Sequence, residues 1–254
     1  MKLSNRTVLI TGGTSGIGLE LARQLLARGN VVIVTGRDHE RLDATKRALP
    51  SVHTFRSDVS NPSAIAALHA AVLAQFPALD TLINNAGIMR NLDLTADRDL
   101  ADVTREIEIN LSGPVRMVQQ FLPHLTTRKG ALIVNVSSGL AFVPLPIAPV
   151  YSATKAALHA YTQSLRVQLH GTGVTVVELA PPAVETLLFR GEFAEEMAGQ
   201  KAMDVKDLAR HAIAGIEKGH LEIRPGLANV LKLMSRIAPG FILKQMSGLA
   251  KRAT

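Results

Sequence analysis

Tyr151 and Lys155 have the spacing of a proton-transfer pair. They lie four residues apart in PVYSATKAAL, residues 149–158, at the predicted start of a helix, and Ser138 precedes the tyrosine by thirteen residues. Residues i and i+4 share one helix face, so the lysine ammonium can lie near the phenol. An unperturbed phenol has a pKa of about 10, and a nearby cation lowers it, which would let Tyr151 act as acid or base. The alternative is a surface tyrosine beside an unrelated lysine.

A glycine-rich loop near the N-terminus has the composition of a phosphate-binding turn. The loop TGGTSGIG, residues 11–18, follows a predicted strand and opens a predicted helix. Its glycines permit backbone angles and close approaches that a β-carbon would block, and the helix N-terminus offers unpaired N–H groups to a pyrophosphate. A glycine-rich turn without a ligand is the alternative. The position after the first strand favours a bound dinucleotide.

Short apolar runs alternate with amphipathic stretches such as the one carrying Ile17, Leu21 and Leu25. Strands separated by helices need crossover connections, which produce a parallel sheet covered on both faces. The predicted fold is therefore a three-layer, doubly wound α/β fold. Its predicted strands are residues 7–11, 31–35, 52–55, 79–84, 131–136 and 174–179. The glycine loop, Ser138 and Tyr151 would then meet beyond the carboxyl ends of the strands.

The whole chain, residues 1–254, is predicted to form one domain. Its composition, 47% hydrophobic, suits one sizeable core. Helical spacing lapses at 183–203, which we expect to be a substrate lid. No apolar run approaches the roughly 20 residues that span a bilayer, and no stretch has the form of a signal peptide, so we expect a cytoplasmic protein. Cysteine is absent, which excludes disulfide and thiolate chemistry.

Positive charge is concentrated at the C-terminal end. The formal charge is +7, and none of the 21 acidic residues lies beyond Glu222. The segment 227–254 is predicted to be basic and amphipathic; it would pack on the body or a second subunit, with contact to an anionic membrane surface less favoured. We expect no nucleic-acid partner, because tryptophan is absent and tyrosine scarce. The histidines lack the spacing and carboxylate neighbours of a metal site, so no metal is expected. Six basic residues follow Glu222: Arg224, Lys232, Arg236, Lys244, Lys251 and Arg252.

The order of four motifs resembles that of the short-chain dehydrogenase/reductase family. They are TGGTSGIG, Asp58-Val59 after the third predicted strand, NNAG at 84–87, and YSATK at 151–155 with Ser138 before it. The resemblance covers essentially the whole chain and implies a Rossmann-like sheet of about seven parallel strands. It also implies an NAD(P)H-dependent oxidoreductase that transfers a hydride between nicotinamide and a small-molecule carbonyl compound or secondary alcohol. Members of the family self-associate, so we expect a homodimer or homotetramer.

The same resemblance gives roles to individual residues. Ser138 would hold and polarise the substrate oxygen, Tyr151 would protonate it, and Lys155 would also bond the nicotinamide ribose. Asn110, in a predicted long helix, would anchor a water in the proton relay. The family commonly has Pro-Gly where this chain has Pro181-Pro182, and the positions after it are assigned by analogy. Besides Tyr151 and Lys155, the residues expected to bind the cofactor are Gly12, Thr14, Ser15, Gly16, Ile17, Gly18, Arg37, Asp58, Val59, Asn85, Ala86, Gly87, Val184 and Thr186.

The end of the second predicted strand favours NADP(H) over NAD(H). An acidic residue closing this strand would bond both ribose hydroxyls of NAD and repel a 2′-phosphate. Gly36 holds that position here and Arg37 follows it, and a guanidinium suits a dianionic phosphate. Asp38 and the lack of a basic residue in the glycine loop oppose this preference.

Residues 139–150, GLAFVPLPIAPV, are almost wholly apolar. Such a wall favours a hydrophobic ketone or aldehyde as substrate. A packed loop or an oligomer contact is the alternative. The alternative function is a noncatalytic dinucleotide-binding sensor or scaffold, which the set of Ser138, Tyr151 and Lys155 disfavours because a sensor needs no proton donor.

Overall fold

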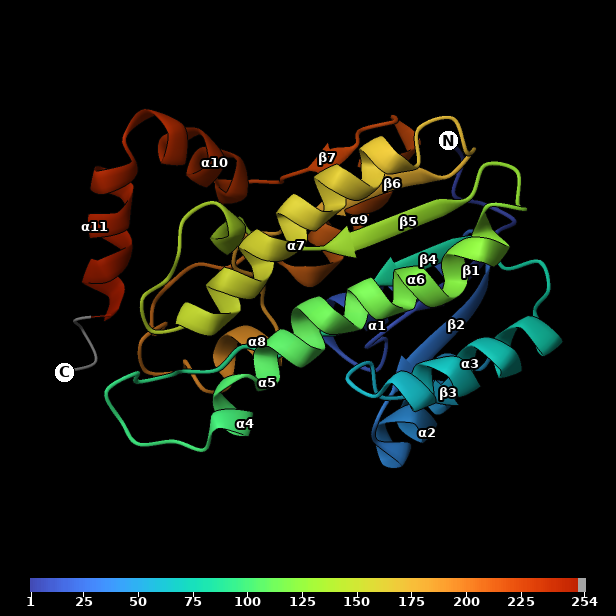
Figure 1. Cartoon of the computed structure of the whole chain (residues 1–254), viewed down its shortest axis with the longest axis horizontal. Helices are drawn as coiled ribbons and strands as arrows, with labels where there is room; N and C mark the ends of the chain where they lie inside the picture. The colour runs from blue at the N-terminus through green and yellow to red at the C-terminus, as the bar shows by residue number, and fades with distance from the viewer. Residues whose placement is uncertain (251–254) are drawn as a thin grey trace.

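The computed structural model describes residues 1–250, in which seven strands form one parallel sheet with helices on both faces (Figure 1). The strand order is β3-β2-β1-β4-β5-β6-β7. The chain thus builds outward from β1 in one direction and then from β4 in the other, which leaves a crevice where the two halves meet. The predicted Rossmann-like fold is confirmed. The strands are β1 (Thr7–Ile10), β2 (Val31–Gly36), β3 (His53–Arg56), β4 (Thr81–Asn84), β5 (Leu132–Val136), β6 (Thr175–Leu179) and β7 (Glu222–Ile223).

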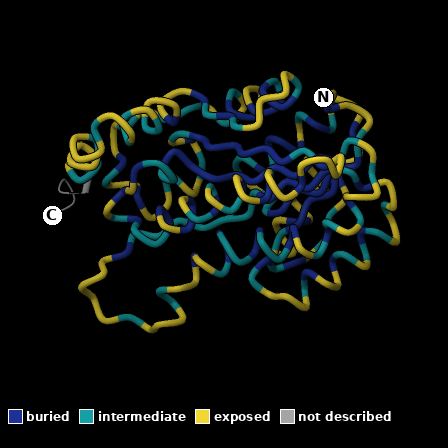
Figure 2. The backbone as a smooth tube through the Cα atoms, turned by 45° about the horizontal axis from the view of Figure 1, so that its top comes forward, coloured by how far each residue is buried: buried dark blue, intermediate teal, exposed yellow. Residues whose placement is uncertain are grey.

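Side chains on alternate positions of each strand enter opposite apolar layers. On β1, Val8 and Ile10 pack with α1 (Gly16–Leu26) and α9 (Val205–Glu217), whereas Leu9 packs with α3 (Pro62–Gln75) and α6 (Gly113–Leu125). The long helix α7 (Pro149–Gln168) covers the same face as α6, and α2 (His39–Ala48) lies beside β2 and β3 (Figure 1). Figure 2 shows the buried centre of the molecule following the sheet. Burial on both faces explains why the strands are continuous apolar runs.

The C-terminal segment forms two helices, α10 (Leu227–Ile237) and α11 (Pro239–Ala250). The inner side of α10 packs on the turn η2 (Gly139–Ala141), since a β-carbon at Gly139 would lie 3.2 Å from Leu231. Its outer side leaves Val230, Leu233 and Ile237 exposed. Within residues 1–250, no helix combines the length and apolar character needed to cross a membrane. The predicted tail charges Lys251 and Arg252 lie outside the described residues.

The segment 183–203 has little regular structure. It contains the single turn α8 (Leu187–Arg190) and a bridge that pairs Val184 with Met203. Phe193 and Met197 are both buried, and they anchor this segment to the rest of the protein. Its movement as a lid stays a prediction.

Two buried side chains hold the backbone that follows β4. Asn110 accepts a hydrogen bond from the Ile88 N–H at 2.9 Å and donates one to the Ile88 carbonyl at 2.8 Å. Glu106 Oε1 accepts from the Arg90 N–H at 3.0 Å. Glu106 lies on α5 (Arg105–Ile107), which follows the short α4 (Leu100–Val103). Asn110 lies on the π-helical turn η1 (Glu108–Ser112).

The π-helical turn corrects the prediction that Asn110 lies in a regular long helix. In an α-helix the residue at 114 would donate its N–H to the Asn110 carbonyl, but Pro114 has no N–H. A wider turn therefore replaces the regular one, as is frequent at functional sites.

Glu106 is a buried carboxyl with only one partnered oxygen. It is 1% exposed, and its Oε2 has no hydrogen-bond partner among the described residues. Burial raises the pKa of Glu106 to about 7, although the Arg90 N–H and charge oppose this effect. Between pH 4.5 and about 7 the folded chain keeps a proton here that the unfolded chain releases. The stability of the protein should therefore fall as the pH rises through this range.

Glu106→Gln should stabilise the protein above pH 7, by about 3 kcal/mol at most. Glutamine keeps the acceptor for the Arg90 N–H but cannot ionise. Urea denaturation at pH 5 and pH 8 measures the effect, and the gain should be much smaller at pH 5. Glu195→Gln, an exposed site, serves as the control and should show no such gain. A Glu106→Gln protein no more stable than wild type at pH 8 contradicts the prediction.

Candidate active site

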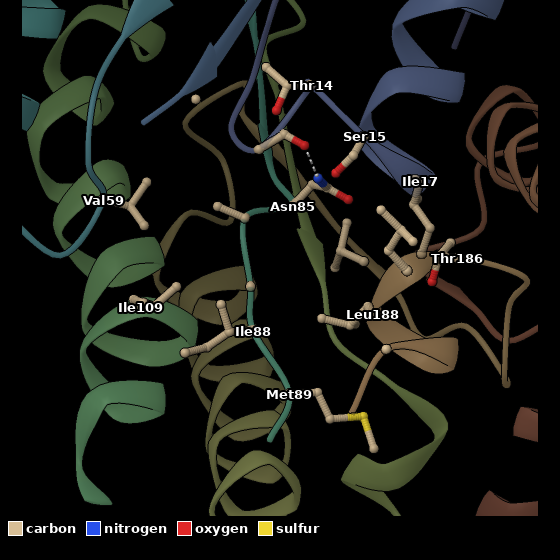
Figure 3. A pocket seen from close by; sticks show the side chains of 18 of the residues that line it. Thr14, Ser15, Ile17, Val59, Asn85, Ile88, Met89, Ile109, Thr186 and Leu188 are labelled. Atoms are coloured by element: carbon tan, nitrogen blue, oxygen red, sulfur yellow. Dashed lines mark hydrogen bonds between the residues drawn. The ribbon is translucent and has the colours of Figure 1, made fainter. Parts of the chain in front are cut away.

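A cleft of about 920 Å³ lies beyond the carboxyl ends of the central strands (Figure 3). Its size is that of sites that hold a cofactor or a drug-sized ligand. Of the residues predicted from sequence, Gly18, Asn110, Ser138 and Val184 do not line it. Those that do are Gly12, Thr14, Ser15, Gly16, Ile17, Arg37, Asp58, Val59, Asn85, Ala86, Gly87, Tyr151, Lys155 and Thr186.

The glycine loop is locked to the NNAG motif. Asn85 Nδ2 donates to the carbonyls of Thr11 at 2.9 Å and Gly12 at 3.0 Å (Figure 3). Gly12 has a φ of +64°, and a β-carbon there would lie 2.8 Å from the Ala86 Cα. A β-carbon at Gly18 would lie 2.5 Å from the Asn85 amide nitrogen. Only glycine fits these contacts. Gly18 therefore lets the loop pack against the Asn85 side chain, although it does not line the cleft itself.

The first turn of α1 suits an anion. Among the described residues no side chain caps it, and it contains no acidic residue. Its N–H groups, aligned with the helix dipole, therefore point toward the cleft floor formed by Thr14 and Ser15.

Basic side chains mark the end of the cleft near β2. Arg37 and Arg41 both line it, and Arg37 Nη1 lies 3.7 Å from Asp58 Oδ2. Burial disfavours ionisation of Asp58, but hydrogen bonds from Ser60 and the charge of Arg37 outweigh it and hold the pKa of this carboxyl below its ordinary value. Asp38 accepts from the Arg41 N–H as the N-cap of α2, so its carboxylate is partly committed to the helix. Arg41, on the first turn of α2, was not predicted from the sequence, although it follows Arg37 by only four residues.

The proposed proton-transfer residues meet at the other end of the cleft. Tyr151 and Lys155 are 6% and 4% exposed, and Lys155 Nζ donates to the Val136 carbonyl at 2.9 Å. The ammonium lies over the Tyr151 ring, 5.5 Å from its centroid. A β-carbon at Gly87 would lie 3.2 Å from Asn110 Oδ1 and 3.7 Å from Lys155 Nζ. The fold thus brings the NNAG, Asn110 and YSATK positions together.

Burial reverses the acidity predicted for this pair. Burial raises the pKa of Tyr151 to about 12, with the Ser138 hydroxyl opposing and the charge of Glu106 adding to the shift. Burial lowers the pKa of Lys155 to about 8, and Glu178 opposes that shift. The expectation that the pKa of Tyr151 is lowered is therefore wrong, because desolvation of the buried phenol outweighs the effects that favour the phenolate.

Ser138 is held by the turn that follows β5. It is 8% exposed, and its Oγ accepts from the Leu140 N–H at 3.1 Å as the N-cap of η2. The Oγ keeps its own proton available for a second partner such as a substrate oxygen.

The apolar loop 139–150 packs inward. Leu145 and Ala148 form a buried cluster with Tyr151, Phe193 and Met197, and the only described residue of 139–151 that lines the cleft is Tyr151. The loop therefore supports Tyr151 from behind, in line with the packed-loop alternative. Leu187, Leu188 and Glu192, from the predicted lid segment 183–203, line the cleft. Other lining side chains were not predicted from the sequence, among them Met89, Arg90 and Arg105.

One histidine, His159, has a carboxylate neighbour that was not predicted from the sequence. His159 Nδ1 lies 2.7 Å from Glu178 Oε2. The two residues are nineteen apart in sequence, on α7 and β6, so no local spacing reveals the contact.

The residues present fit a nicotinamide dinucleotide. Gly12 and Gly18 let the loop pack closely against Ala86 and Asn85, the start of α1 suits a pyrophosphate, and Arg37 lies where the adenosine ribose would extend. The far end of the cleft carries a phenol and an ammonium.

Comparison with known proteins agrees with this site. The chain is 41% identical over 248 residues to the uncharacterized oxidoreductase DltE of Bacillus subtilis, covering 97% of this chain and 98% of that one. It is 36% identical over 199 residues to the NADP-dependent 3-hydroxy acid dehydrogenase YdfG of Salmonella typhi, covering 76% and 79%.

Solved structures share the whole architecture. A short-chain dehydrogenase from Sphingobium yanoikuyae in complex with NADPH superposes with a TM-score of 0.81 at 28% identity, over 93% of this chain and 95% of that one. Other similar structures hold NADP or NADH. The family model described as short chain dehydrogenase matches residues 6–197. By fold, motif order and these likenesses, the chain belongs to the short-chain dehydrogenase family of oxidoreductases.

Proposed function

We propose that this protein is an NADPH-dependent reductase of ketones or aldehydes. The observation that carries the proposal is the meeting of a buried Tyr151–Lys155 pair with the glycine-loop cleft. Ser138 lies at the start of the turn beside that pair. A noncatalytic dinucleotide-binding sensor would need the cleft but not the phenol, the ammonium and the hydroxyl beside it.

A bound nicotinamide dinucleotide would supply the hydride. Ser138 Oγ would donate a hydrogen bond to the carbonyl oxygen, where negative charge grows in the transition state. Tyr151 would give its phenolic proton to that oxygen. Lys155 would stabilise the phenolate left behind, because a nearby cation favours the ionised form.

The raised pKa of Tyr151 suits the role of proton donor that reduction requires. With a pKa of about 12 the phenol keeps its proton at neutral pH. An alkoxide is a much stronger base than a phenolate, so transfer from Tyr151 to the nascent alkoxide is downhill. Oxidation of an alcohol would need Tyr151 ionised beforehand.

The cofactor preference rests on Arg37 and Arg41. Both guanidinium groups line the end of the cleft where a ribose 2′-phosphate would lie. Two carboxylates lie nearby: Asp38 caps α2, and Asp58 lies 3.7 Å from Arg37. The NADP dependence named for YdfG is consistent with this assignment.

The substrate end favours a carbonyl compound with an apolar body. Ile88, Met89 and Leu188 surround the pocket below Asn85 (Figure 3). Arg90 is held by Asp102 at 2.8 Å, and Glu192 Oε2 accepts from the Asn91 N–H at 3.1 Å. Arg105 is therefore the charged residue we expect to contact a polar substituent. Self-association as a dimer or tetramer stays a prediction that light scattering can check.

Tyr151→Phe should lower kcat for carbonyl reduction by about 100-fold or more while NADPH still binds. A panel of ketones and aldehydes, followed by loss of NADPH absorbance, first identifies a substrate. NADPH fluorescence then measures binding to the variant. The matched control is Tyr161→Phe, because Tyr161 is the only other tyrosine and lies nearly three helical turns away on α7.

The reductase assignment is refuted if Tyr151→Phe turns over at a near-normal rate. NADPH binding without turnover of any panel compound would favour the sensor alternative.

Arg37→Ala should reduce the ratio of kcat/KM for NADPH to that for NADH by about tenfold or more, because one charge-assisted contact to the 2′-phosphate is lost. Steady-state kinetics with both cofactors give the ratio. Arg47→Ala removes the same charge from the exposed last turn of α2 and should leave the ratio unchanged. An unchanged ratio in Arg37→Ala contradicts the role of this residue.

A further inference from the structure

A polar stripe runs along the face of α7 that carries the reactive pair. Tyr151, Lys155, His159 and Gln163 recur at intervals of four residues, so they share one side of the helix. His159 Nε2 lies 3.1 Å from Gln163 Nε2, at the exposed end of the stripe. The proposed reaction uses the first two residues and gives no part to His159.

Glu178 lies beside this stripe at the centre of the protein. It is wholly buried on β6, and both of its oxygens are partnered. Ser137 Oγ donates to Oε1 at 2.5 Å, and His159 Nδ1 lies 2.7 Å from Oε2. A buried carboxylate is costly unless hydrogen bonds and opposite charge compensate for the lost water. The fold therefore keeps this charge for a reason that packing alone does not supply.

Lys155 is the cation that Glu178 acts on. Its ammonium donates to the carbonyl of Val136, the residue directly before Ser137. Burial lowers the pKa of Lys155, and the charge of Glu178 raises it. Without that charge, a lysine this deeply buried would lose its proton near neutral pH.

The other charged groups around the stripe do not provide a substitute. Glu222 on β7 places a carboxylate oxygen within 4.8 Å of the ligand atoms of both His159 and Glu178, but Arg224 and Lys232 both bind it. The charge of Glu106 on α5 acts on Tyr151 and raises the pKa of its phenol. Because Glu222 already pairs with these two cations, the cluster is a poor metal site.

We propose that Glu178, held in place by His159 and Ser137, is a positioning residue that keeps Lys155 a cation beside Tyr151. Glu178 touches neither substrate nor cofactor and acts through Lys155. The effect of Glu178 on turnover rests on the proposed reductase function, whereas its effect on the charge state of Lys155 does not.

The charge state can be measured without turnover. Protein labelled with ¹³C at the lysine ε-carbon is titrated by NMR, and the Lys155 signal is assigned from its loss in Lys155→Met. In Glu178→Gln the midpoint of the Lys155 titration should fall by about one pH unit or more. Glu178→Asp, which restores the charge, should return it toward the wild-type value. Glu222→Gln is the matched control and should move it far less, because Arg224 and Lys232 already neutralise that carboxylate.

Ser137→Ala supplies a second variant with a small change in volume, should Glu178→Gln fail to fold. It removes the donor to Glu178 Oε1 and should lower the Lys155 midpoint in the same direction by a smaller amount. An unchanged midpoint in folded Glu178→Gln, or in Ser137→Ala if the former is unfolded, overturns the proposal.

Kinetics separate this proposal from the reductase assignment. In Glu178→Gln the alkaline limb of the kcat profile should move to lower pH by the same amount as the NMR midpoint. A merely structural role would lower kcat at every pH and leave the limb in place, which would overturn the positioning role. If the NMR shift occurs but no carbonyl compound is reduced, the proposed reductase function is wrong, whereas the role of Glu178 in keeping Lys155 charged is supported.

Discussion

The active site depends on an ammonium group held inside the protein. Burying one costs several kcal/mol unless opposite charge and hydrogen bonds compensate. Here the Val136 carbonyl supplies the bond and Glu178 the charge. Val136 ends β5 and Glu178 lies on β6, and the register pairs Asn135 with Glu178. The pairing of β5 with β6 thus places the Val136 carbonyl and the charge of Glu178 around the Lys155 ammonium, while α7 sets its position relative to the Tyr151 ring.

The cofactor side of the cleft is built differently, from backbone that polar side chains tie down. Asn85 secures the glycine loop, Asn110 secures Ile88, and Glu106 secures Arg90. Each tie joins segments far apart in sequence, so the motifs are scattered along the chain although they act at one place. Apolar packing forms the sheet and its two helical layers, whereas a few hydrogen bonds set the shape of the site.

The sequence predicted those parts of the structure that follow from local pattern. Five strands, β1, β2, β4, β5 and β6, are largely buried apolar runs and were recognisable for that reason. The more exposed β3 was also predicted, whereas β7 has only the residues Glu222 and Ile223. The direction of the Tyr151 pKa shift was not predictable, because burial depends on the packed loop behind the ring. Tertiary contacts likewise decided the place of Arg41 and the partner of His159. Pro114 was a local signal for the irregular turn at Asn110, but the apolar periodicity masked it.

Both tyrosines of this chain lie on α7, and tryptophan is absent. The near-ultraviolet absorption of the polypeptide therefore comes almost entirely from two phenols on one helix, one of which is the proposed proton donor. Ionisation of a phenol changes this absorption strongly, so the protein carries its own optical reporter of Tyr151 against a background of a single second chromophore.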